Sequence, residues 1–154
     1  MGYLEKNLLP GETVAYRAHL HLIIFFQAGF FALVGLAFVV FGLVNPGMAA
    51  FWVLGAVFLI YAASFGIGRA IHYFSSEFAI TNKRVVIKVG LINRKTLEMV
   101  LTKVETIRVD QSILGRVLNF GTIVVTGTGG TNEPFTLIAN PLEFRRQVQA
   151  RSAG

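Results

Sequence analysis

The sequence predicts an α-helical membrane hairpin followed by a mainly β domain that ends in a helix. Three observations support this fold class. Hydrophobic residues make up 54% of the chain and charged residues only 14%, whereas charged residues form about a quarter of a typical soluble domain. Asp, Glu, Lys and Arg are absent from residues 18–68. Beyond residue 76 the apolar residues recur with a period of two, which is typical of strands.

The charge of the chain is confined to its C-terminal part. Residues 1–68 hold two basic and two acidic side chains, and residues 69–154 hold twelve basic and six acidic ones, so the net charge of +6 belongs to the latter. This excess predicts an anionic neighbour, and for a chain in a membrane the simplest one is anionic lipid. Nucleic acid is not expected, because no basic run is interleaved with aromatic residues.

Two apolar runs are each long enough to span a bilayer. A helix rises ~1.5 Å per residue, so residues 20–44 exceed the ~30 Å hydrocarbon core. The Asn-Pro-Gly turn at 45–47 ends this helix, and residues 48–70 form the second one. A signal peptide is disfavoured because the first run is too long and has no basic start. A buried soluble hairpin is disfavoured because so short a chain cannot cover two apolar helices.

The flanking charges predict the orientation of this hairpin. Arg17 precedes the first span and Arg69 follows the second, while the connecting turn carries no charge. By the positive-inside rule, both termini are cytoplasmic and the protein is multi-pass. Transport by this chain alone is not expected, because no Asp, Glu, Lys, Arg or His residue lies between Leu22 and Gly68.

Small residues recur at seven-residue spacing in both apolar runs. Such rows allow two helix backbones to approach closely, either within the hairpin or between protomers. The alternative is that membrane helices are rich in Gly and Ala in any case. The predicted transmembrane packing residues are Ala28, Gly35, Gly42, Ala49, Ala56 and Ala63.

The remaining segments predict a β domain. Strands are expected at residues 77–81, 84–90, 94–101, 103–110, 121–128 and 134–139, and residues 12–19, within the N-terminal segment 1–19, form a further strand before the hairpin. Val104 and Ile107 are three residues apart, which predicts a bulge near Glu105 and Thr106. Asn140 and Pro141 predict a helix start. The cytoplasmic domain is therefore expected to cover residues 71–154.

Two groups of side chains are candidate sites. The first is basic, and it is expected at the membrane exit and on a wet strand face, where it binds lipid headgroups or is simply solvated. It comprises Arg69, Lys83, Arg84 and Lys88. The second is apolar, and it forms an assembly contact with a neighbouring subunit, a contact with the bilayer, or a plug for the open end of the barrel. It comprises Ile113, Leu114, Val117 and Leu118.

Several kinds of chemistry are not expected. The chain has no Cys, so disulfides, thiolate metal sites and a Cys nucleophile are excluded. His19, His21 and His72 can meet at the interface, but no carboxylate accompanies them closely, so no metal site is predicted. Neither a phosphate-binding loop nor a Ser, His and acid motif occurs, so neither an enzyme nor a cofactor is expected.

Part of the sequence resembles the bacterial pleckstrin-homology (PH) family, second type. The resemblance depends on the segments 78–84 (FAITNKR), 101–107 (LTKVETI), 109–112 (VDQS) and 114–118 (LGRVL), with Gly90, Gly121-Thr122 and Asn140-Pro141. It implies a seven-stranded open barrel or sandwich capped by a C-terminal helix, anchored in the bacterial inner membrane by one or two hairpins. Phosphoinositide binding is not transferred, because here the hairpin replaces the loop that binds it in the eukaryotic namesakes.

The expected function is therefore a non-enzymatic scaffold. A shared fold does not fix a function, but the family is one of binding and assembly modules. The domain is expected to form a homo-oligomer or to bind a membrane complex at the cytoplasmic face. Two alternatives stay open, namely a module that senses anionic lipids and an accessory subunit of a transporter or membrane enzyme.

Overall fold

The computed structural model describes residues 3–45, 47–48, 50–91, 95–130 and 132–152. The chain divides into two compact units, Leu22–His72 and the combination of Met1–His21 with Tyr73–Gly154. Three residues used in the sequence-based predictions lie outside the described part. These are Pro46 of the expected turn, Ala49 of the expected packing row and Arg94 of the expected strand.

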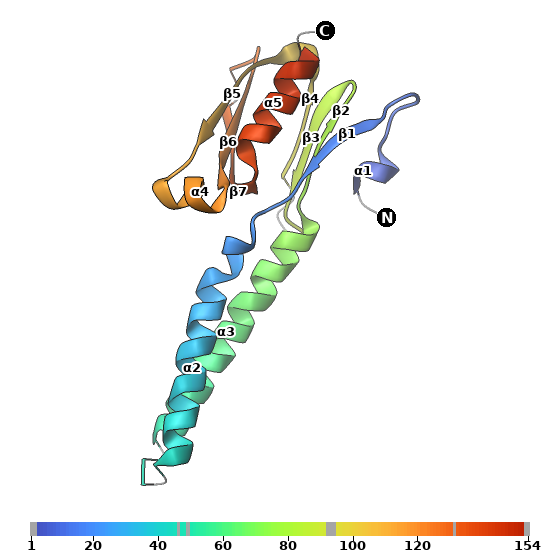
Figure 1. The fold of residues 1–154 in the computed structure, drawn as a ribbon. Helices are drawn as coiled ribbons and strands as arrows, with labels where there is room; N and C mark the ends of the chain where they lie inside the picture. Colours follow the sequence, from blue (N-terminus) through green and yellow to red (C-terminus); the bar gives the residue numbers. More distant parts are fainter. Residues whose placement is uncertain (1–2, 46, 49, 92–94, 131, 153–154) are drawn as a thin grey trace. The chain divides into compact units, whose positions relative to one another are not determined.

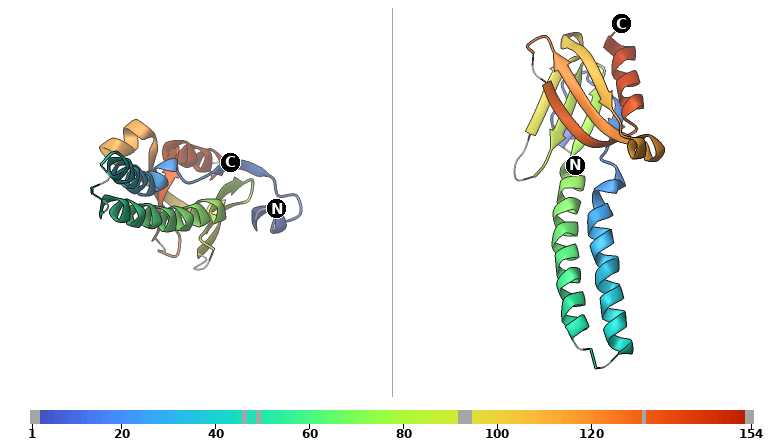
Figure 2. Two further views of the ribbon diagram at one scale, coloured as in Figure 1. Left: turned by 90° about the horizontal axis from the view of Figure 1, so that it is seen from below. Right: turned by 90° about the vertical axis from the view of Figure 1, so that its left-hand side faces the viewer.

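The first unit is a hairpin of two helices that run side by side (Figures 1 and 2). A short 3-10 turn, η1 (Leu22–Phe25), leads into α2 (Phe26–Val44), and α3 (Ala50–Ser75) returns. Both helices are long and apolar enough to cross a membrane. Their outward side chains, such as Leu33, Val53 and Ile60, are large, apolar and exposed. α3 continues beyond the expected residue 70, because residues 69–75 contain neither Gly nor Pro.

The two helix backbones touch at Gly35 and Gly55. A Cβ atom added to Gly35 would lie 3.0 Å from the carbonyl oxygen of Gly55, and one added to Gly55 would lie 2.9 Å from that of Gly35. On one side of this contact a series of stacked rings joins the helices, with ring centroids 5.8 Å apart for Phe38 and Phe58. Glycine at both positions therefore sets the distance between the helices.

Of the predicted packing residues that the structure describes, those on α2 are buried and those on α3 are exposed. Ala28, Gly35 and Gly42 are the buried residues of α2. On α3 the buried small residues are Gly55 and Ala62, each one position before Ala56 and Ala63, which are exposed. The Gly35–Gly55 contact sets this rotation of α3. Contact of the row through Ala56 and Ala63 with a second protomer stays a prediction.

The second unit contains two antiparallel sheets in the part of the chain that the structure describes. The four-stranded sheet has the order β1-β2-β3-β4, and the three-stranded sheet has the order β5-β6-β7. Their bounds are β1 (Val14–Ala18), β2 (Glu77–Thr81), β3 (Arg84–Val89), β4 (Lys95–Val100), β5 (Val104–Asp110), β6 (Phe120–Gly127) and β7 (Asn132–Ala139). The register shift between Val104 and Thr106 is the predicted bulge. These sheets, with the helices that precede and follow them, confirm the expected fold class.

The strand before the hairpin pairs with the strand after it. β1 runs antiparallel to β2, with Arg17 opposite Ala79 and Ala18 opposite Phe78. The next residues join the other sheet, because the amide of His21 donates to the carbonyl of Leu137 at 2.7 Å. The segment that leads into the hairpin therefore connects both sheets.

The core lies between the two sheets and under the last helix, α5 (Pro141–Ser152). The rings of Phe78 on β2 and Phe135 on β7 meet edge to face, with centroids 6.2 Å apart. α5 packs against β5, β6 and β1 (Figure 1). Its apolar stripe, Phe144 and Val148, is fully buried.

The sequence did not predict the short helix α1 (Tyr3–Lys6). Its Leu4 is buried and packs against Ala79 of β2 and Val86 of β3. These two residues face away from the core, since neighbouring residues of a strand point to opposite faces. The N-terminal segment therefore covers part of the outer face of the four-stranded sheet, over β2 and β3.

Candidate functional site

A short helix, α4 (Ile113–Leu118), connects β5 to β6. The hydroxyl of Ser112 caps its first turn by accepting a hydrogen bond from the amide of Gly115 at 3.0 Å. Asn119 ends the helix with a left-handed backbone, φ 60°, and its amide donates to the carbonyl of Gly115. Ser and Asn are the residue types that favour these two positions, so local sequence fixes both ends of α4.

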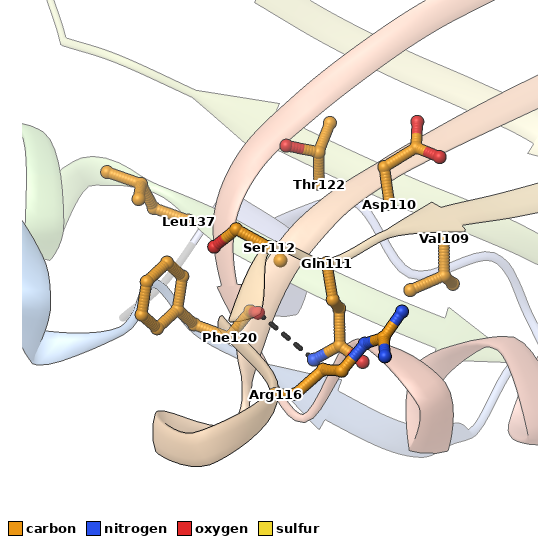
Figure 3. A pocket seen from close by; sticks show the side chains of 9 residues that line it. Val109, Asp110, Gln111, Ser112, Arg116, Phe120, Thr122 and Leu137 are labelled. Carbon is orange, nitrogen blue, oxygen red and sulfur yellow. Dashed lines mark hydrogen bonds between the residues drawn. The ribbon is translucent and has the colours of Figure 1, made fainter. Parts of the chain in front are cut away.

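α4 is held tightly against the start of β6. Gly115 is buried, and a Cβ atom there would lie 2.6 Å from the carbonyl oxygen of Phe120. The side-chain amide of Gln111 donates to the carbonyl of Phe120 at 3.0 Å (Figure 3). It also donates to the carbonyl of Gly115 at 3.2 Å. The helix therefore has a fixed position on the domain.

The apolar side chains of α4 point away from the domain. Ile113, Leu114 and Val117 are 83%, 68% and 76% exposed, and Leu118 is 44% exposed. We call these four residues the α4 surface. The alternative in which they plug the end of the barrel is wrong for the first three, because only the Gly115 side of the helix faces the domain. So many exposed apolar side chains on one short helix indicate an interaction surface.

An open groove of about 550 Å³ lies beside α4. Figure 3 shows its wall, where Asp110 and Thr122 come from adjacent strands, Arg116 from α4 and Leu137 from β7. Leu137 has a left-handed backbone, φ 59°, close to the place where the pairing of β6 and β7 shifts register. Drug-sized ligand sites are mostly concave and apolar, whereas this groove is shallow and has charges of both signs at its rim.

Comparison with known proteins decides the family. A family model described as a bacterial PH domain matches residues 24–152, which is most of the chain. The chain belongs to the bacterial PH domain family. Comparisons with curated proteins and with solved structures found no match. The resemblance in the sequence is thus confirmed, and because PH domains are in general non-catalytic, the coarse function that follows is an interaction module.

The four basic residues that the sequence analysis singled out do not form one open patch. Arg84 and Lys88 were expected on a wet face of β3, but they are largely buried, with the side chain of Arg84 only 14% exposed and Lys88 only 8% exposed. This expectation was wrong because the N-terminal segment covers that face. Lys83 is exposed and its ammonium group donates to the carbonyl of Pro10 at 2.9 Å, while Arg69 lies partly buried on α3, in the other unit.

Arg84 is held by a carboxylate that the sequence analysis did not single out. Its Nε lies 2.9 Å from Oε1 of Glu12 and its Nη2 lies 3.0 Å from Oε2 of Glu12. Glu12 also accepts hydrogen bonds from the hydroxyl of Thr81 and the amide of Leu9. The two partners are far apart in sequence, so no local pattern signals the pair.

These contacts keep Glu12 ionised. Burial of the carboxylate raises its pKa. The hydrogen bonds from Arg84, Leu9 and Thr81, together with the charge of Arg84, lower the pKa by a larger amount, so it is about 2 instead of 4.5. The charged groups of Glu12 and Arg84 thus bind each other within the domain.

One of the histidines at the start of the hairpin, His21, has an aromatic partner. The ring of His21 stacks on that of Phe120, with centroids 5.2 Å apart. Within the described ranges of the chain, no three His, Asp or Glu side chains come together in a way that suits a metal ion. The stacking instead links the last residue before η1 to the strand on which α4 is fixed.

Proposed function

We propose that this PH domain protein is a non-enzymatic interaction module, anchored by its hairpin in the bacterial inner membrane, that assembles with copies of itself or with another membrane protein at the cytoplasmic face. The observation that carries the proposal is the pairing of β1 with β2. The chain leaves the domain after β1, forms two apolar helices, and returns in β2. The domain is therefore attached to the hairpin at two points.

Double attachment keeps the domain within a short distance of the membrane surface. Confinement to a surface raises the effective concentration of any partner in the same membrane. Membrane insertion of the hairpin is supported by the exposure of its large apolar side chains, among them Leu33 and Ile60. In hydrocarbon this exposure is favourable, whereas in water it would drive aggregation.

The cytoplasmic position is supported by the charges at the two attachment points. Arg17 is the last charged residue before the hairpin, and Arg69 lies near the end of α3. The exposed connection around Gly47 and Met48 carries no charge. Basic flanks at one end only favour retention of that end in the cytoplasm.

Assembly is supported by an edge of the four-stranded sheet. β4 is the last strand of that sheet. A groove of about 220 Å³ lies between Lys95, Thr96 and Leu97 of β4 and Glu133 and Phe135 of β7. An edge strand beside a groove with an apolar floor and opposite charges suits the addition of a strand from a partner.

Anchoring is tested with single cysteines, because the natural chain has none. We expect Met48→Cys to react with a membrane-impermeant maleimide in intact cells, and Thr128→Cys, in the exposed turn after β6, to react only after lysis. The chain should also stay in the membrane pellet after alkaline carbonate extraction. Release into the supernatant, or labelling of Thr128→Cys in intact cells, would refute the anchoring or its orientation.

Assembly is tested on the detergent-purified chain. Light scattering should give a mass above one chain or show a stoichiometric co-purifying membrane protein. Where the partner is a second copy, a short bis-maleimide should cross-link Thr96→Cys of one copy to Thr96→Cys of the other, because the chain has no other thiol. The comparison is Thr128→Cys, which is also exposed but lies in the turn after β6, near the end of β4 that is remote from Thr96, and should cross-link less. A monomer without any co-purifying protein would contradict the assembly part of the proposal.

A further inference from the structure

We propose that the α4 surface inserts into the headgroup region of the bilayer that holds the hairpin. The inference depends on the proposed membrane anchoring and goes beyond it, since it assigns the domain a third membrane contact. The occupant proposed for this surface is thus lipid and not a second protein.

The position of α4 within the domain favours lipid. His21 is the last residue of the domain before the chain enters η1 and α2. Its ring stacks on Phe120, and the carbonyl of Phe120 lies directly against Gly115 of α4. Two successive contacts therefore connect α4 to the point where the chain leaves the domain for the apolar helices. α4 therefore lies at the end of the domain from which the chain leaves for the hairpin, and the proposed anchoring makes this the end that meets lipid.

The chemistry of α4 suits the boundary between headgroups and acyl chains. Ile113, Leu114 and Val117 are more than two thirds exposed, and their transfer from water into an apolar phase is favourable. Arg116 lies between them in the sequence and is exposed. An arginine beside inserted apolar side chains can extend its guanidinium group to lipid phosphates.

The way α4 is held reduces the entropy lost on insertion. The cap from Ser112, the hydrogen bonds from Gln111 and the close contact of Gly115 fix the helix before any lipid binds. A pre-ordered binding surface loses less conformational entropy on association. With the two attachment points, a third contact would also restrict rotation of the domain above the membrane, and so fix the direction in which the edge of β4 faces.

The test uses three single-cysteine variants of the full chain, each labelled with an environment-sensitive fluorophore. Val117→Cys reports on α4 and Leu33→Cys on the hairpin, while Thr128→Cys is the control. Thr128 follows the end of β6 opposite to α4, and an eight-residue strand spans more than ~20 Å. The labelled proteins are reconstituted into vesicles of phosphatidylethanolamine and phosphatidylglycerol that carry nitroxide lipids.

We expect a nitroxide near the headgroups to quench the label at residue 117 at least threefold more strongly than the label at residue 128. A nitroxide deep in the acyl chains should quench the label at residue 33. If residue 33 is quenched and residue 117 is quenched no more than residue 128, the inference is overturned while anchoring stands. If residue 33 is not quenched, the anchoring itself fails. Shielding of residue 117 from aqueous iodide without quenching by lipid would show that protein covers α4, and would also overturn the inference.

Discussion

Glu12 and Arg84 form an ion pair, with 2.9 Å between Oε1 and Nε, although they are 72 residues apart in sequence. The intervening chain includes both apolar helices. Glu12 is buried, and Arg84 also contacts the carboxylate of Glu98 on β4. The pair therefore joins the segment before the hairpin to the sheet that follows it.

Glu12→Gln should destabilise the β domain by about 2 kcal/mol, because the substitution removes a buried charged hydrogen-bond partner of Arg84. The measurement is thermal unfolding of the detergent-purified chain, followed by circular dichroism. Glu5→Gln is the matched control, since the pair of Glu5 with Arg17 is exposed and contributes little. Equal midpoints for the two variants would contradict a structural role for the Glu12–Arg84 pair.

The same pair predicts a dependence of stability on pH. The pKa of Glu12 is lowered to about 2 in the folded chain from 4.5, so the unfolded state binds a proton more readily than the folded state. The contribution of Glu12 is therefore complete above about pH 4.5 and is lost as the pH falls towards about 2. The midpoint of unfolding should fall less steeply over this range for Glu12→Gln than for the natural chain, and identical slopes would refute the assignment.

Gly35→Leu should separate the hairpin helices, because Gly35 touches the carbonyl of Gly55 and extra volume in a packed contact typically costs about 1–3 kcal/mol. The emission of Trp52, the single tryptophan, reports the change, since this residue packs against Gly42 of α2. Gly29→Leu is the control on the same helix, because a Cβ atom there meets nothing within 4 Å. A similar emission shift in both variants would argue against a close approach at Gly35.

Gly115→Ala should loosen α4 from the domain. Alanine has the higher helix propensity, yet its Cβ atom would lie 2.6 Å from the carbonyl of Phe120, so the clash outweighs the propensity. Amide hydrogen exchange in residues 113–118 should become about tenfold faster, equivalent to about 1.4 kcal/mol. Gly129→Ala, at a position with open space, should leave exchange unchanged, and unchanged exchange in Gly115→Ala would show that α4 tolerates the clash.

Leu4→Ala should uncover the part of the outer sheet face that β2 and β3 form. Leu4 packs against Ala79 and Val86, and removal of a buried leucine side chain costs about 2 kcal/mol or more. Chemical unfolding of the purified chain in detergent measures the loss. Leu9→Ala is the comparison, because Leu9 is half exposed and should change stability by less than about 1 kcal/mol.

The sequence by itself determined the elements whose signal is local. The absence of charge over residues 18–68 identifies both apolar helices, and the period of two identifies β2 with the bounds that the structure gives it. The three-residue spacing of Val104 and Ile107 identifies the bulge of β5. The apolar group from Ile113 to Leu118 marks the segment that forms α4, and the motifs identify the family. Each of these signals lies within the element or motif that it identifies, so it can be read without knowing what packs against that element.

Only the tertiary structure decided which faces are covered. Arg84 and Lys88 alternate with apolar residues as on a wet strand, but α1 and Glu12 bury that face after the hairpin has brought the N-terminal segment back to β3. The contact of Gly35 with Gly55 likewise decided which side of α3 faces α2. Burial depends on what packs against a face. For β3 the packing partner is separated from it by the whole hairpin, and for α3 it lies on the other helix, so no local pattern shows either.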